Sequence, residues 1–317
     1  MRYKIVLRRN LLILALLMAA FAQVKAQYEP SFSHYWAMET SFNPAAVGKQ
    51  DKINVDVAYN MSLLGFENNP KTMYASADLP FYFLGAYHGV GAKFVNDQIG
   101  LFAHNSIAIM YAVRLKMLGG SLSIGVQPTL IGEKFDGSKV VTEEPNDPAF
   151  STSALTGSGF DLGAGLYYQH RYWYVGASIM HALAPKVELG ENNELSISRT
   201  YYFTAGGNIR LRNPFLSIQP SVLGRTDGVV YRADVTARLT YQHEKRRLYL
   251  GVGYSPTNSV TVYIGGNFHG INLGYSYEAY TNGLKLGNGS HELKVGYQTD
   301  LNLFKKGRNR HQAVRIL

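Results

Sequence analysis

The stretch FDLGAGLYYQHRYWYVGASIMH, residues 160–181, decides the fold. Along two segments of it, apolar side chains alternate with small or polar ones with a period of two. The apolar positions are Phe160, Leu162, Ala164, Leu166 and Tyr168, then Trp173, Val175, Ala177 and Ile179. Two alternating segments with a short break between them predict a β-hairpin. Each strand is about ten residues long with aromatic residues near the turn, which is typical of a tilted strand that crosses a bilayer.

The same alternation recurs along the chain from residue 53 to residue 304. Further strands are predicted at 53–60, 72–79, 89–96, 102–115, 121–131, 199–211, 215–224, 229–241, 247–255, 259–268, 271–279 and 291–303. With the hairpin this gives about fourteen strands, an even number. The sequence therefore predicts an all-β protein, a transmembrane up-and-down antiparallel β-barrel of about 14 strands.

A soluble β-sandwich shows the same alternation with its apolar side inward, so the connections must decide between the two folds. The long connections, 61–71, 132–157, 183–197 and 281–290, all follow odd-numbered strands. The tight turns at 169–171, 212–214 and 269–270 follow even-numbered ones. Long loops on one rim and short turns on the other are typical of a bacterial outer-membrane barrel.

The N-terminus predicts export from the cytoplasm. Arg2, Lys4, Arg8 and Arg9 precede an apolar run from Leu11 to Ala22, and small residues surround a cleavage site near Ala26. This pattern indicates a secretory signal peptide over residues 1–26. The composition fits an exported all-β chain, with 17% charged residues, 23 Tyr, 32 Gly and no Cys. We expect the protein in the outer membrane.

The net charge of +9 does not indicate nucleic-acid binding once it is located. Five of the 31 basic residues lie in 1–26 and five lie beyond residue 304, which leaves 21 basic against 22 acidic residues in between. A nucleic-acid-binding protein needs a clustered basic footprint, which the body of this chain lacks.

Motifs for catalysis or metal binding are weak. His104 and Ser106 share a strand face, as in outer-membrane lipases and acyltransferases, but no sequence-adjacent nucleophile arrangement supports catalysis, and two polar lumen residues are the simpler interpretation. The acidic loop stretches lack the ligand spacing of a calcium site. We therefore expect no enzyme activity, no cofactor and no metal site.

Charged residues on the polar strand faces are predicted to point into the lumen, because a cation facing lipid at the bilayer midplane costs roughly 2 to 4 kcal/mol. These residues are Asp161, Arg232, Asp234, Arg238, Glu278, Glu292 and Lys294. They either form a plug-like network or line a pore, and the sequence leaves both open.

Short motifs, in order along the chain, resemble the PorP/SprF family of Bacteroidota outer-membrane proteins. They are Asn43-Pro44-Ala45 with Gly48, Asn96-Asp97 with Gly100, the 161–166 stretch DLGAGL, Val175-Gly176-Ala177-Ser178 with His181, Gln219-Pro220-Ser221, the 274–278 stretch GYSYE and the 289–293 stretch GSHEL. The resemblance implies a non-enzymatic barrel of type IX secretion and gliding motility. Such a barrel assists secretion, or holds a secreted adhesin at the surface through the adhesin's C-terminal domain. A porin-like or lipophile-conducting channel is the alternative.

The predicted organisation is a signal peptide (1–26), an aromatic periplasmic or lumenal arm (27–52), a barrel (53–304) and a basic periplasmic tail (305–317). With an even number of strands, the arm and the tail are expected to emerge at the same rim. Their predicted contacts are outer-membrane lipids and periplasmic or outer-membrane secretion components. The residues expected to bind a partner are Trp36, Phe42, Lys305, Lys306, Arg308 and Arg310.

Overall fold

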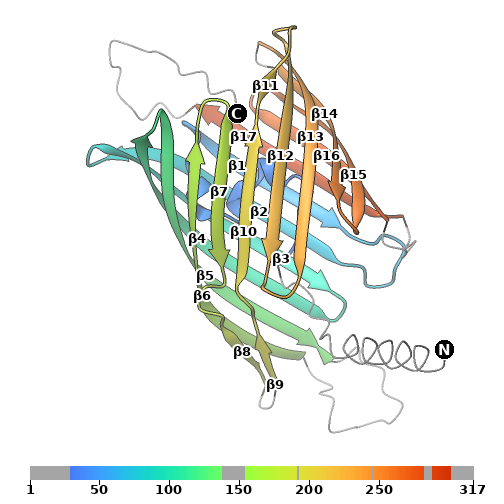
Figure 1. Ribbon diagram of the computed structural model, residues 1–317. Coiled ribbons are helices and arrows are strands. Elements are labelled where there is room, and N and C mark those ends of the chain that lie inside the picture. The colour runs from blue at the N-terminus through green and yellow to red at the C-terminus, as the bar shows by residue number, and fades with distance from the viewer. Residues whose placement is uncertain (1–28, 138–153, 191–192, 245, 282–287, 301–317) are drawn as a thin grey trace, which may run out of the picture.

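In a computed structural model of the chain, the described residues are 29–137, 154–190, 193–244, 246–281 and 288–300. Fourteen strands of these residues form one closed antiparallel barrel (Figure 1), as the sequence predicts. They are β1 Lys52–Met61, β2 Lys71–Phe83, β3 Ala86–Ile99, β4 Phe102–Met117, β5 Gly120–Asp136, β6 Ala154–Gln169, β7 Trp173–Met180, β10 Thr200–Gly207, β12 Leu216–Thr226, β13 Tyr231–His243, β14 Arg246–Ser255, β15 Ser259–Phe268, β16 Ile271–Tyr280 and β17 Ser290–Asp300. Neighbours in the chain are neighbours in the sheet, and β17 pairs with β1 to close it.

The period of two in the sequence becomes the two faces of the wall. In β6, Phe160 is 52% exposed, whereas its neighbour Asp161 is 2% exposed. Large apolar side chains such as Ile109, Leu130 and Leu250 are likewise exposed on the outer face. A closed barrel satisfies its backbone hydrogen bonds internally, so this apolar outer face suits hydrocarbon.

The connections sort to two rims. The long-loop rim carries the four longest connections, 62–70, 137–153, 181–199 and 281–289, together with the shorter turns 100–101, 227–230 and 256–258. The short-turn rim carries 84–85, 118–119, 170–172, 244–245 and 269–270, together with the start of β1 and the end of β17. It also carries 208–215, in which β11 (Ile209–Arg210) adds a short pairing to β12.

A small hairpin lies over the wall at the long-loop rim. Strands β8 (Lys186–Leu189) and β9 (Asn193–Ser196) pair with each other outside the barrel sheet. Val187 of β8 is buried with Ile131 of β5 and Ile197. A Cβ at Gly157 in β6 would overlap the Glu188 backbone, so a glycine there lets the hairpin lie close.

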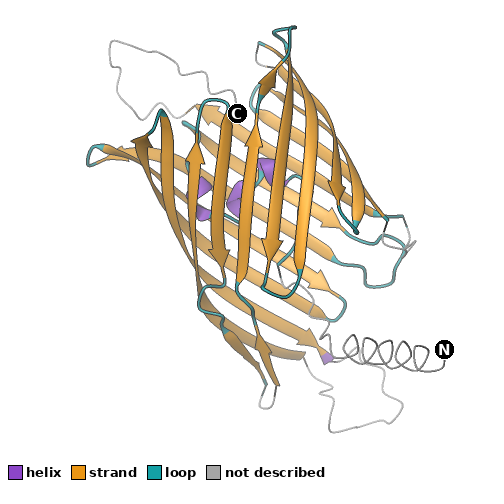
Figure 2. Ribbon diagram, in the orientation of Figure 1, coloured by secondary structure: helices purple, strands orange, loops and turns teal. Residues whose placement is uncertain are grey.

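Residues 29–51, here called the lumenal arm, fold inside the barrel. Three short 3₁₀ turns, η1 (Tyr35–Ala37), η2 (Glu39–Ser41) and η3 (Pro44–Ala46), lie within the ring of strands (Figure 2). Pro44 opens η3, and the Asn43 side chain accepts a hydrogen bond from the backbone N–H of Ala45. Among the described residues, no helix has the length and apolar character to cross a membrane.

Candidate functional site

The lumenal arm passes lengthwise through the barrel. Near its start, Glu29 Oε1 lies 2.7 Å from Nε2 of His181, which follows β7 at the long-loop rim. Near its end, the backbone N–H of Gly48 donates to the Asp78 carboxylate of β2, and the chain enters β1 at the short-turn rim. This differs from the expectation that the arm emerges at the rim of the tail. The strand count fixes where β1 begins, but not the path of the chain before it.

A buried carboxylate of β17 holds the first turn of the arm. Glu292 Oε1 accepts a hydrogen bond from His34 Nδ1 at 2.6 Å and one from the backbone N–H of His34 at 2.9 Å. Its Oε2 accepts from the backbone N–H of Ser33 at 2.6 Å. Both side chains are fully buried. Three hydrogen bonds to one carboxylate satisfy a charge that would otherwise be costly to bury.

Aromatic residues of the arm fill the space beside this contact. The Tyr35 hydroxyl donates to Thr236 Oγ1 at 3.1 Å. Phe42 stacks on Tyr202 of β10 with ring centroids 5.4 Å apart. These rings form one cluster with further wall residues, Met180 and Leu223. The arm is therefore packed against the wall like a protein core.

The third turn, η3, packs against a part of the wall where glycines leave no side chain on the lumen face. A Cβ added at Gly125 or Gly165 would overlap Ala45 or Asn43 of the arm. Asn43 Nδ2 also donates to the carbonyl of Leu166 at 3.1 Å. Glycine in a strand interior marks a close approach of another backbone, which is what happens here.

A charged cluster fixes the start of the arm near the long-loop rim. His181 Nδ1 lies 2.7 Å from Asp161 Oδ2, and its Nε2 faces the Glu29 carboxylate. Burial opposes the charge of His181, but its hydrogen bonds to Asp161 and Glu29 outweigh burial and raise its pKa to about 9. The imidazolium therefore bridges the wall and the arm at neutral pH.

The seven charges predicted to face the lumen fall into several separate groups. Arg232 contacts both Asp234 (Nε to Oδ1, 3.0 Å) and Glu278 (Nη2 to Oε1, 3.2 Å), so these three lie together on β13 and β16. Lys294 forms an ion pair with Asp56 of β1. The other three predicted charges lie where the arm meets the wall. Asp161 contacts His181, which in turn faces Glu29 of the arm, and Glu292 contacts His34. The guanidinium carbon of Arg238 lies 3.6 Å from the ring centroid of Trp36.

Of the residues predicted to bind a partner, two lie in the lumenal arm and four lie outside the described residues. Phe42 is buried in the aromatic cluster, and Trp36 packs under Arg238 and edge-on to Tyr249 at a centroid distance of 5.0 Å. Both therefore contact the barrel wall in this structure. Lys305, Lys306, Arg308 and Arg310 lie outside the described residues and stay a prediction.

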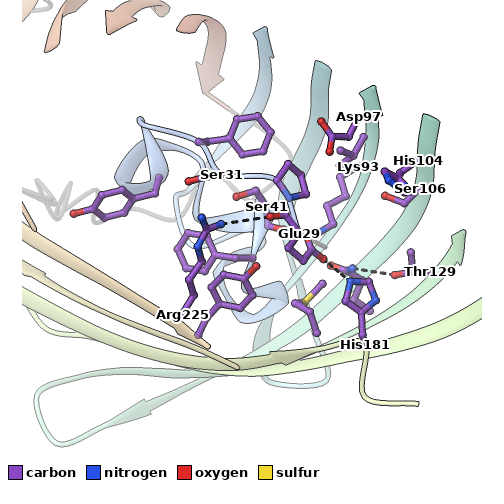
Figure 3. A pocket seen from close by; sticks show the side chains of 18 of the residues that line it. Glu29, Ser31, Ser41, Lys93, Asp97, His104, Ser106, Thr129, His181 and Arg225 are labelled. Atoms are coloured by element: carbon purple, nitrogen blue, oxygen red, sulfur yellow. Dashed lines mark hydrogen bonds and ion pairs between the residues drawn. The ribbon is translucent and has the colours of Figure 1, made fainter. Parts of the chain in front are cut away.

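A cavity of about 820 Å³, counting the part open to solvent, lies between the arm and the wall of β3–β5, β7, β10 and β12. Its lining includes the charged residues Glu29, Lys93, Asp97, His181 and Arg225, and Figure 3 shows Lys93, His181 and Arg225 around Glu29. His104 and Ser106 also line it. The imidazole of His104 is hydrogen-bonded to Glu133 of the neighbouring strand. Within the described ranges, no group of three His, Cys, Asp or Glu residues is placed to hold a metal ion.

Sequence reasoning missed the residues that hold the arm. His34, Tyr35 and Glu29 lie in a segment without periodicity. The sequence around them therefore does not predict which residues they contact. A usable signal was present in the wall: glycines 125 and 165 occupy lumen-facing positions near the middle of long strands. Such glycines indicate that another segment approaches the wall closely.

Three comparisons place the chain among known proteins. The family model described as type IX secretion system membrane protein PorP/SprF matches residues 24–297. The search of curated proteins finds no match. Among solved structures, the CymD monoaromatic hydrocarbon channel has 10% identity and a TM-score of 0.53 over 88% of this chain and 95% of that one. A Pseudomonas aeruginosa FadL homologue has 11% identity and a TM-score of 0.48, over 81% of this chain and 92% of that one.

At such low identity the structural neighbours show the fold alone. The family match carries more, because it spans the arm and nearly all of the barrel. It agrees with the motifs between Asn43 and Leu293 that resemble the same family. The chain belongs to the PorP/SprF family of type IX secretion system membrane proteins, and it is an outer-membrane β-barrel.

Proposed function

We propose that this barrel serves type IX secretion through protein–protein contacts, assisting the secretion or the surface anchoring of a secreted adhesin. The observation that carries the proposal is the lumenal arm. Its three turns pack against the wall through a buried carboxylate, an aromatic cluster and a charged cluster, so the chain itself occupies the centre of the barrel. A barrel with a filled centre offers its rims and loops, rather than an aqueous path, to other molecules.

The two rims offer different surfaces for such contacts. At the long-loop rim the β8–β9 hairpin adds structure beyond the sheet, which suits recognition of a large surface protein. The short-turn rim faces the periplasm if long loops face outward, as they do in bacterial outer-membrane barrels. We place the contact with secretion components at the short-turn rim and the contact with an adhesin at the long-loop rim.

Deletion and tagging test the proposal together. Deleting the gene from its native host should abolish secretion or surface display of one or a few adhesins, whereas outer-membrane permeability to small solutes should stay unchanged. A tagged wild-type copy should restore display and should co-isolate a type IX secretion component or the adhesin. Normal display of every secreted adhesin in the deletion strain would contradict the proposal.

A channel for lipophilic molecules is the second candidate, because a cavity lies beside the arm and the fold resembles that of the hydrocarbon channel CymD. The lining argues against it. Glu29, Lys93, Asp97, His181 and Arg225 all border the cavity, and ionisable groups make a poor path for an apolar solute. Uptake of a labelled apolar compound by the wild type but not by the deletion strain would favour the channel.

A further inference from the structure

Tight turns at the short-turn rim place four side chains at equivalent tip positions. The first tip residues are Leu84, Leu118, Glu244 and His269, and their φ angles are 45°, 51°, 52° and 54°. A positive φ at this position is usual for Gly, Asn or Asp in a two-residue hairpin and is an outlier for a bulky residue. Two of the four tips carry polar residues there, whereas the two neighbouring hairpins β2–β3 and β4–β5 carry leucine.

Both leucines are almost entirely exposed, Leu84 at 86% and Leu118 at 83%. The following residues, Gly85 and Gly119, have open space where a Cβ would stand, so the described part of the chain does not cover either tip. Leucine is thus held in an unfavourable backbone region while its side chain faces solvent or a partner. Backbone outliers of this kind point to function.

The exposed apolar surface continues onto the lumen side of the β2–β3 hairpin. Tyr82 and Tyr87 are directly paired across it and lie on the face that alternates with Phe83. They are 51% and 36% exposed, and the Arg114 guanidinium lies 6.0 Å from the ring centre of Tyr87. Lipid can cover the outward Phe83, but it cannot reach tyrosines that face the mouth of the barrel. We call Tyr82, Leu84, Tyr87 and Leu118 the hairpin-tip surface.

The charged residues around the short-turn rim indicate which kind of partner surface would complement it. The described residues of this rim carry more exposed cations than exposed acids, and the acids are Asp51, Glu244 and Asp300. The cations are Lys116, Arg171, Arg210, Arg212 and Arg246. A partner whose contact surface is acidic around an apolar cleft complements both features, and electrostatic attraction of this kind also speeds encounter.

We propose that the hairpin-tip surface docks a periplasmic protein, with Leu84 and Leu118 inserted into an apolar cleft that acidic side chains border. The inference rests on the proposed role in protein–protein contact and adds the surface and the partner's chemistry. Burying both leucines in the complex offsets the free energy that their positive φ angles cost. The two tyrosines supply rigid, amphipathic contact area, as at other interfaces. Anchoring in the inner leaflet is the competing explanation, and it leaves Tyr82 and Tyr87 without a role.

The test uses the full chain in its native host. The double variant Leu84→Asn, Leu118→Asn removes the apolar tips and puts a residue that tolerates positive φ at both positions, so the turns stay formed. His269→Asn makes the same change at a polar tip and is the control. We expect the double variant to fold, as judged by its heat-dependent gel shift. Its affinity for the periplasmic partner should fall by at least about tenfold, with a parallel loss of adhesin display, while the control stays at wild-type level.

Photo-crosslinking separates a protein partner from lipid. With a benzoylphenylalanine at position 84 or 118, irradiation of cells should cross-link the barrel to one periplasmic protein, the same one from both positions. The cross-linked peptide of that protein should be apolar and flanked by acidic residues. Position 269 should give no such adduct. Adducts with phospholipid alone, or full partner affinity in the double variant, would overturn the proposal. If deletion of the whole gene leaves adhesin display intact, it is the proposed function that fails; if deletion abolishes display but the double variant is normal, only the docking surface fails.

Discussion

At the scale of single residues, the protein depends on buried charges that join the arm to the wall. The sequence predicted that Asp161, Glu292 and Arg238 face the lumen, because alternation along a strand assigns a face to every side chain. It could not predict that His181, His34 and Trp36 meet them. These partners lie in segments without a period, and their positions follow from the path of the arm.

Replacing Glu292 by alanine should release the first turn of the arm. The change leaves His34 and two backbone N–H groups without their acceptor at a fully buried site, and breaking such a pair costs roughly 3–5 kcal/mol. We expect proteolysis within residues 29–51 of the folded variant in detergent, at protease concentrations that leave the wild type intact. Glu67→Ala, at an exposed loop position, should behave like the wild type.

The arm should also loosen at high pH. The pKa of His181 is about 9 in the folded protein against an ordinary value of 6.5, so its charge stabilises the folded form fully below pH 6.5. This stabilisation is lost as the pH rises through 9. Thermal unfolding in detergent between pH 6 and pH 10 should show a falling midpoint across this window. In His181→Gln the midpoint should be lower at pH 6 and nearly flat; an unchanged slope would assign the pH dependence to other groups.

At the scale of elements, the strands were the most predictable part, because each one carries its own signal. All fourteen predicted strands overlap strands of the structure, and the four longest connections all lie at one rim, which also carries the shorter turns 100–101, 227–230 and 256–258. The β8–β9 hairpin and the three 3₁₀ turns were not predicted. They are too short to show a period and are held by contacts with distant strands.

Two arginine substitutions on one strand face test the membrane position of β6. Leu166→Arg puts a cation on the outer apolar face of β6, and a cation at the bilayer midplane costs roughly 2–4 kcal/mol of folding free energy. Ser158→Arg points the same way but lies near the long-loop rim, where the cost is about 0–1 kcal/mol. The yield of heat-shifting barrel in the outer membrane measures both. Equal yields for the two variants would mean that this face does not contact lipid.

The β8–β9 hairpin should depend on one glycine. A Cβ in Gly157→Ala overlaps the Glu188 backbone, so the hairpin must move away from the wall, at a cost of roughly 1–3 kcal/mol. Cleavage within 186–196 by added protease should become faster, while the barrel stays intact. Gly132→Ala is the matched control, because its Cβ meets nothing closer than 4.0 Å. Faster cleavage in both variants would show a general loosening of this rim.

At the scale of the whole molecule, the sequence left a plug and a pore equally open, because both need polar lumen faces. Ser276 illustrates the difficulty. Alternation places it on the lumen face, but only the path of the arm shows that this space is filled: a Cβ added at Gly274, two residues away on the same face, would lie 2.9 Å from His34 Nε2 of the arm. A segment that folds into a closed wall makes many long-range contacts and few local ones, so its place is a property of the complete barrel.

Single-channel recording in a planar bilayer tests the central claim most directly. The purified full chain should insert without steady ohmic conductance, because the lumenal arm occupies the barrel through Glu292, Phe42 and His181. Deleting residues 29–48, or replacing Glu292 and His181 together so that the arm is loosened without being removed, should produce long-lived or flickering open states. Steady, open conductance by the wild-type protein, equal to that of the deletion variant, would contradict the account and favour the channel.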